Sequence, residues 1–107
     1  MTVKLAPAHL TDLANTNDLG RALAATLADS GAASTLIVNA AEYWATDDEV
    51  VVTKAERSDA TARATGYIAF TDTPWEACGA TIHAQRRTIL IAVEVDLNSG
   101  NTEVQVL

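Results

Sequence analysis

Side chains that could carry out acid–base, nucleophilic or metal chemistry are few and scattered along the chain. The 107 residues include two histidines, His9 and His83, and one cysteine, Cys78. Neither histidine belongs to an HxxxH or HExxH spacing, and a single cysteine forms neither an intramolecular disulfide nor a cysteine-based zinc site. Cys78 stands between alanine and glycine, a context typical of a small buried apolar residue. We therefore expect no metal site, no cofactor and no catalytic residue that the sequence identifies.

Phosphate-binding and acyl-transfer motifs are also absent from the sequence. It contains no GxGxxG, no GxxxxGK[ST] and no GxSxG. The five glycines stand far apart, so neighbouring glycines cannot build a phosphate loop. They are residues 20, 31, 66, 79 and 100.

The aromatic residues suggest one alternative function. A helix that covers a curved sheet can enclose an apolar pocket, which is the usual form of a small-ligand site. A desolvated Asp47, Asp72 or Glu76, or His83, would then act as a base, as in a cofactorless enzyme. The simpler interpretation is that the two tryptophans close the ends of the core. The side chains that would line the mouth of the pocket are Tyr43, Trp44, Tyr67, Trp75 and His83.

The charge balance limits the classes of partner. Asp and Glu number 14 against 7 Lys and Arg, which gives a net charge of -7. Binding to a nucleic acid backbone needs clustered basic residues, so nucleic acid is an unlikely partner class, and an anionic membrane surface is disfavoured for the same reason. A basic protein partner is permitted. The same acidity also serves solubility alone.

The length and the apolar segments favour a single domain over residues 1–107. The first residues contain no apolar core of a secretory signal, and no segment approaches the length of a membrane-spanning helix. We therefore expect a cytoplasmic protein.

The clearest structural pattern is a β-hairpin over residues 89–107. Apolar residues alternate from Ile89 to Leu97, and Ser99-Gly100 provides a tight turn. If Ser99 and Gly100 are the only loop residues, Val95 lies opposite Val104, Asp96 opposite Glu103, and Glu94 opposite Gln105. The C-terminal strand is then either an edge of the sheet, which needs a cover or a partner, or near its centre.

The outer face of this hairpin carries the residues that we consider first for partner binding. Opposed like charges destabilise a strand pair, so the acidic face either binds a cation or a basic partner or is simply solvated. Arg86-Arg87 is the only adjacent basic pair, and it either pairs with these acids or with a second subunit or is itself solvated. A Ca²⁺ site built from the acids lacks any EF-hand spacing. The residues of this partner-binding hypothesis are Glu94, Asp96, Glu103, Arg86 and Arg87.

The other elements are read from periodicity and turn signals. Leucines at helical spacing predict a helix over residues 17–30, either alone or as part of one longer helix from residue 8, which ends at Gly31. Residues 34–39 read as a strand or a short apolar connection, and Asp47-Asp48 as a turn. Residues 49–57 and 61–70 form a second hairpin, which residues 71–74 break. Alternation along its second strand places Ala62, Ile68 and Phe70 on one face.

The segment before the C-terminal hairpin has a fault in its alternation. Ile82 and Ala84 have one parity, and Ile89 and Ile91 the other. We expect a β-bulge at residues 85–87 within one strand from residue 80, or else a turn at residues 84–87 between two strands.

These elements predict an α+β fold, with an N-terminal helix or two short helices packed on a curved, mostly antiparallel sheet of four to six strands. The acidity and the lack of catalytic motifs favour a small non-enzymatic protein-binding module that acts through its sheet or edge, as a homodimer. Chaperone-like, inhibitor, immunity-type and phage-assembly roles belong to this class.

Overall fold

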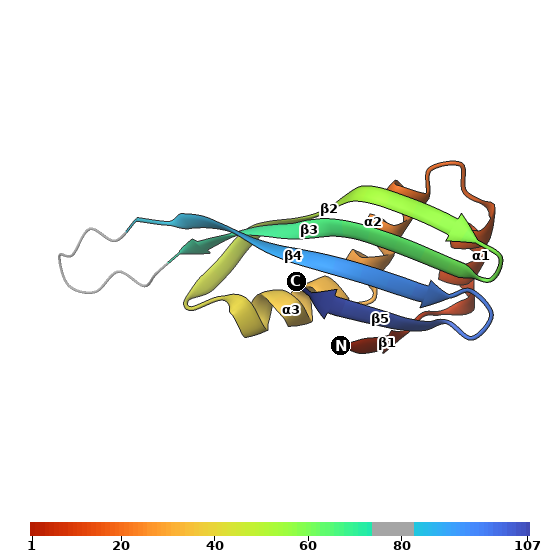
Figure 1. Ribbon diagram of the computed structural model, residues 1–107. Helices are drawn as coiled ribbons and strands as arrows, with labels where there is room; N and C mark the ends of the chain where they lie inside the picture. Colours follow the sequence, from red (N-terminus) through yellow and green to blue (C-terminus); the bar gives the residue numbers. More distant parts are fainter. Residues whose placement is uncertain (74–82) are drawn as a thin grey trace.

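An antiparallel sheet of five strands forms the framework of the fold. The computed structural model describes residues 1–73 and 83–107, and within them the strands lie in the order β1-β5-β4-β3-β2 (Figure 1). The expected α+β class with a curved sheet is confirmed. The strands are β1 (Thr2–Lys4), β2 (Trp44–Ser58), β3 (Thr61–Thr73), β4 (Gln85–Asp96) and β5 (Asn101–Val106).

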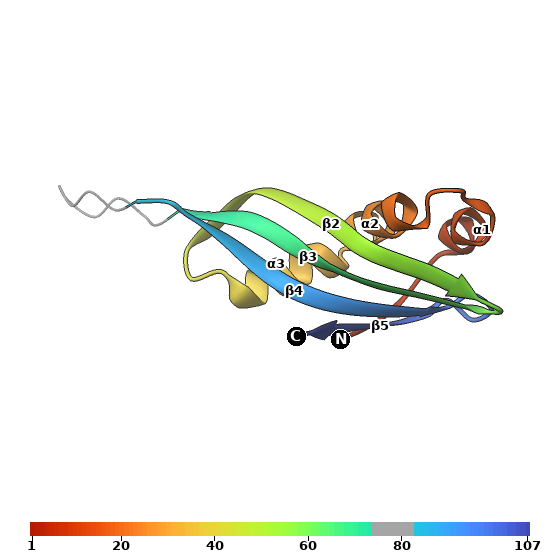
Figure 2. The same ribbon diagram turned by 45° about the horizontal axis from the view of Figure 1, so that its top comes forward.

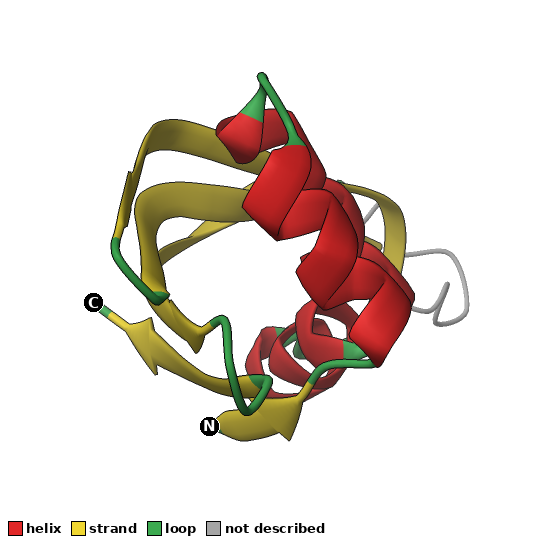
Figure 3. Cartoon of the chain, turned by 90° about the vertical axis from the view of Figure 1, so that its right-hand side faces the viewer, coloured by secondary structure: helices red, strands yellow, loops and turns green. Residues whose placement is uncertain are grey.

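The helices precede the long strands and lie on one face of the sheet. They are α1 (Pro7–Asn15), α2 (Leu19–Asp29) and α3 (Ala32–Ala40). Figure 2 shows α1, α2 and α3 following one another along the length of the sheet, and Figure 3, which looks along the molecule, shows the curved sheet facing the helices. We call the helix side the inner face of the sheet and the opposite side the outer face. None of the described helices is long and apolar enough to cross a membrane.

The N-terminal helical region consists of two short helices, one of the two expected arrangements. Pro7 begins α1, where its missing N–H costs nothing. Asp18 caps α2, since its Oδ1 accepts a hydrogen bond from the backbone N–H of Arg21 at 3.1 Å. Gly31 follows the end of α2 with a φ of 83°, a left-handed conformation that favours glycine. The predicted stop at Gly31 is therefore confirmed.

The strand predicted over residues 34–39 is wrong, because this segment belongs to α3. Thr35, Ile37 and Val38 have β-branched side chains, which favour strands locally. However, Ala33, Leu36 and Ile37 recur at helical spacing and are buried in the core, so packing overrides local propensity.

The hairpin of β2 and β3 is confirmed, with Ser58 opposite Thr61 across its turn. Asp59 in the turn has a φ of 49°. Two expectations here are wrong. Asp47-Asp48 is a bulge within β2 rather than a turn, and β3 continues through Thr73 rather than breaking at residue 71. Pro74 lies outside the described residues.

The C-terminal hairpin is confirmed, but its register differs from the prediction by two residues. Val93 lies opposite Val104, and Glu94 lies opposite Glu103. The loop comprises residues 97–100 instead of Ser99 and Gly100 alone. A shift of two residues keeps every side chain on its predicted face, so alternation could not distinguish the two registers.

The bulge predicted at residues 85–87 is wrong. The pairing of β3 with β4 is continuous from Thr61 opposite Asp96 to Asp72 opposite Gln85. β4 begins at Gln85, so Ala84 does not belong to the strand, and Ile82 lies outside the described residues. The bulges of the sheet occur in β2 instead, between Thr46 and Glu49 and between Val52 and Lys54.

β5 is not an outermost strand, because β1 lies beside it. Thr2 pairs with Glu103 and Lys4 with Asn101, and the amino group of Met1 donates to the carbonyl oxygen of Val104 at 2.9 Å. The short β1 therefore covers most of the edge that the sequence left open.

One apolar cluster fills the space between the helices and the inner face. Its largest fully buried side chains include Phe70, Leu13, Leu23, Ile68 and Ile91. Arg57 connects α1 to the sheet, because its Nη1 donates to the carbonyl oxygen of Leu13 at 2.6 Å, near the helix end.

The molecule is elongated. Its radius of gyration, 15.6 Å, exceeds the ~13 Å typical of a compact chain of this length, and its principal extents are 56 × 22 × 21 Å.

Candidate interaction surfaces

The outer face of the sheet is not covered by the helices, and an apolar row crosses its middle. The register places Val51, Tyr67 and Leu90 side by side on β2, β3 and β4. Leu107 lies next to them, since its N–H donates to the carbonyl oxygen of Leu90 at 2.9 Å. Leu90 and Leu107 are 55% and 69% exposed. We call these four residues the outer apolar row.

A charged row crosses the same face, separated from the apolar row by one row of side chains. Glu56, Arg63, Glu94 and Glu103 follow one another across β2 to β5. Together with residues between the two rows, such as Lys54 and Thr65, they line a hollow of about 440 Å³. Each of the two opposed glutamates has a cation beside it, since Arg63 Nε lies 3.2 Å from Glu94 Oε2 and the amino group of Met1 lies 4.0 Å from Glu103 Oε1. The predicted acidic face is therefore of mixed charge.

The other two predicted acids have structural partners of their own. Glu103 accepts a hydrogen bond from the Thr2 hydroxyl at 3.0 Å. Asp96 accepts hydrogen bonds from the backbone N–H groups of Asn98 and Ser99 at 2.9 and 3.2 Å. These hydrogen bonds lower the pKa of the Asp96 carboxyl below its ordinary value. Asp96 thus stabilises the turn after β4.

The two adjacent arginines of the hypothesis point to opposite faces of the sheet. Arg86 is on the outer face, where it donates to the carbonyl oxygen of Asp47 and to Thr71 and lies 3.4 Å from Glu49 Oε1. It therefore supports the bulge of β2. The structure does not bring Arg86 and Arg87 together, because successive strand residues alternate between faces.

Arg87, on the inner face, forms an ion pair with a buried carboxylate. Its Nη1 lies 3.0 Å from Asp72 Oδ2 and also donates to the carbonyl oxygen of Ala40, at the end of α3. Asp72 is only 4% exposed and accepts the backbone N–H groups of Glu42 and Tyr43, each at 3.0 Å. Burial opposes ionisation of Asp72, but the hydrogen bonds from Glu42, Arg87 and Tyr43 lower its pKa below the ordinary value. This pair fixes the backbone where α3 leads into β2.

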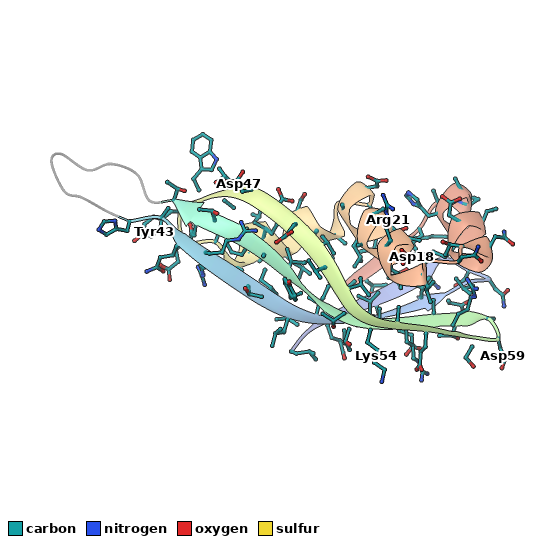
Figure 4. The ribbon with its side chains drawn as sticks, turned by 90° about the horizontal axis from the view of Figure 1, so that it is seen from above. Asp18, Arg21, Tyr43, Asp47, Lys54 and Asp59 are labelled. Atoms are coloured by element: carbon teal, nitrogen blue, oxygen red, sulfur yellow. The ribbon has the colours of Figure 1, made fainter. Side chains whose placement is uncertain are left out.

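The segment fixed by this pair presents two aromatic side chains at one end of the molecule. Tyr43 and Trp44 are 55% and 60% exposed. With Val38, Ala41 and Ala45 they line a surface hollow of about 400 Å³, which we call the aromatic corner. Figure 4 shows Tyr43 and Asp47 at this end and Asp59 at the other.

The other residues proposed for a ligand pocket lie elsewhere. Tyr67 is on the outer face in the apolar row, and His83 is exposed before the start of β4. Trp75, Glu76 and Cys78 lie outside the described residues. Of the pocket residues, the described structure brings only Tyr43 and Trp44 together, and they meet on the surface rather than between helix and sheet.

The sequence patterns did not indicate some of the residues that line these surfaces. Lys54, Glu56 and Arg63 line the outer hollow, and Val38 lines the aromatic corner. The turn at Asp59 was a usable signal, since pairing outward from it places Glu56 opposite Arg63. Val38 was missed because its segment was read as a strand. Within residues 1–73 and 83–107, no group of three or more His, Cys, Asp and Glu side chains is arranged to hold a metal ion.

Comparison with known proteins adds no relative to this description. No family model, no curated protein and no solved structure matches the chain.

Proposed function

We propose that this chain is a small, acidic, non-enzymatic protein-binding module that forms a homodimer through the outer face of its sheet. The observation that carries the proposal is the outer apolar row of Val51, Tyr67, Leu90 and Leu107, which no helix covers. Apolar surface gathered in one place and surrounded by polar residues is typical of protein–protein contacts.

The charges of this face favour a second copy as the occupant. Among the residues that the strand register places on the outer face, four are basic and five are acidic, a net charge of -1, whereas the whole chain carries -7. Two copies that meet through their outer faces therefore repel each other less than two copies that meet through a surface where the excess acids lie. The basic residues are Lys4, Lys54, Arg63 and Arg86, and the acidic ones are Glu49, Glu56, Glu94, Asp96 and Glu103.

The test is the molar mass of the protein in solution, measured by light scattering across a range of concentrations. We expect a dimer for the natural chain and a monomer for Leu90→Glu, because the introduced carboxylate would be buried without a partner in the interface. Ser34→Glu is the matched control, since it adds the same charge on an exposed position of α3, on the helix side. A monomer at every concentration, or a dimer that survives Leu90→Glu, contradicts the proposal.

A further inference from the structure

The aromatic corner is a second surface, distinct from the outer apolar row. Tyr43, Trp44 and Val38 are each more than half exposed around one hollow. Trp and Tyr are the residue types that most often anchor protein partners, because they bring a large contact area at low entropic cost.

The ion pair of the buried Asp72 and the half-buried Arg87 holds the backbone of the corner in place. The Asp72 carboxylate binds the N–H groups of Glu42 and Tyr43, and Arg87 binds both Asp72 and the last turn of α3. The two elements that form the hollow, the end of α3 and the start of β2, are thereby joined. An anchor that is ordered before binding loses less entropy when a partner docks.

Exposed carboxylates lie close to the corner along the chain and favour a positively charged occupant. Glu42, Asp47 and Asp48 are exposed, and in the described part of the chain no ion pair joins their side chains to a cation. The nearby arginines are already engaged, Arg86 with Glu49 and Arg87 with Asp72. This end of the molecule therefore attracts positive charge.

We propose that the aromatic corner binds a basic, arginine-containing segment of a partner protein. Guanidinium groups stack on the rings of Tyr43 and Trp44, and the carboxylates of Glu42, Asp47 and Asp48 pair with the charge. This inference rests on the proposed function only in that the chain binds protein. The hollow of the corner is lined by α3 and the start of β2 and shares no residue with the outer apolar row.

The experiment uses the full chain and a fluorescein-labelled peptide of alternating arginine and glycine, with binding followed by fluorescence anisotropy at low salt. We expect saturable binding that weakens about 3- to 30-fold in Tyr43→Ala and in Trp44→Ala. Trp44→Phe keeps a ring and should lose less. Because both positions are more than half exposed, these variants are expected to fold, and circular dichroism checks this.

Two double variants with equal net charge separate the corner from general acidity. Asp47→Asn/Asp48→Asn should weaken binding, whereas Asp12→Asn/Asp29→Asn, at exposed positions of α1 and α2, should leave it unchanged. Three results would overturn the inference. They are equal weakening of peptide binding in the two double variants, unchanged binding in both alanine variants, and no binding by the natural chain. Leu90→Glu reports on the dimer alone, so the two proposals fail separately.

Discussion

Arg86 and Arg87 are neighbours in the sequence, yet they belong to two different environments. Arg86, on the outer face, contacts the exposed Glu49 and the bulge of β2, whereas Arg87, on the inner face, holds a carboxylate that is 4% exposed. The same contrast runs along most of β3 and β4, with the buried Ala69 on the outer face as an exception. Inner residues are fixed by packing and by buried hydrogen bonds, and outer residues keep their contact with solvent. Stability therefore depends on the inner face, and the outer face is available for recognition.

The largest contrast is expected between Ile91 and Leu90, which are adjacent on β4 and point to opposite faces. Ile91 is 1% exposed, so Ile91→Ala should lower the free energy of unfolding by about 2–5 kcal/mol through lost burial and a cavity. Leu90→Ala should change it by less than about 0.5 kcal/mol in the monomer. Urea unfolding measures both variants at protein concentrations too low for dimer formation, because a dimer would add to the apparent stability. Similar losses in the two variants would show that the outer face is also part of the core.

Gly66 tests how closely the backbones of β2 and β3 are packed on the inner face. A Cβ atom at this position would lie 2.1 Å from the carbonyl oxygen of Val51 and 2.9 Å from Cα of Val52, next to a bulge of β2. Gly66→Ala must therefore move the β2 backbone, and we expect a loss of about 1–3 kcal/mol in urea unfolding. Thr65→Ala, at the next, outward-facing position, serves as the reference. A stable Gly66→Ala protein would mean that β2 adjusts freely.

The pH dependence of the stability tests the ion pair of Asp72 and Arg87. The pKa of Asp72 is lower in the folded protein than its ordinary value of 3.8, so its stabilising contribution is complete well above pH 3.8 and is lost as the pH falls through the lower folded value. Asp72→Asn should lose stability at neutral pH and should show a shallower decline in acid. The measurement is thermal unfolding from pH 7 down to pH 2. Parallel curves for the two proteins would exclude Asp72 as a source of acid sensitivity.

The smallest effect is expected at the exposed pair of Arg63 and Glu94. Both side chains are more than half exposed, so we expect a weak interaction. The variants Arg63→Ala, Glu94→Ala and the double variant should give a coupling energy between the two side chains of about 0–1 kcal/mol, which salt weakens. A double-mutant cycle at two salt concentrations measures it. A coupling well above this range would show that the outer face is more enclosed than its exposure indicates.

The alternation of apolar residues determined much of the fold from the sequence alone. It assigned Ala62, Ile68 and Phe70 to one face, and the structure buries all three. The leucine spacing of α2 and its stop at Gly31 are also confirmed, because amphipathic period and backbone conformation are local properties.

Other features depended on contacts between segments far apart in the sequence. Residues 34–39 form a helix because Leu36 and Ile37 pack into the core, despite a local preference for strand. The register of β4 and β5 was left ambiguous by two residues, since both alternatives bury the same side chains.

The candidate surfaces show the same division. The sequence identified Glu94, Glu103, Tyr43 and Trp44 as residues to examine, because exposed polar and aromatic types are informative by themselves. Only the tertiary structure decided that Arg63 pairs with Glu94, and that Arg87 and Asp72 meet beneath Tyr43. Such pairings depend on strand register and on where α3 ends, and these are set by the packing of the whole chain rather than by any short segment.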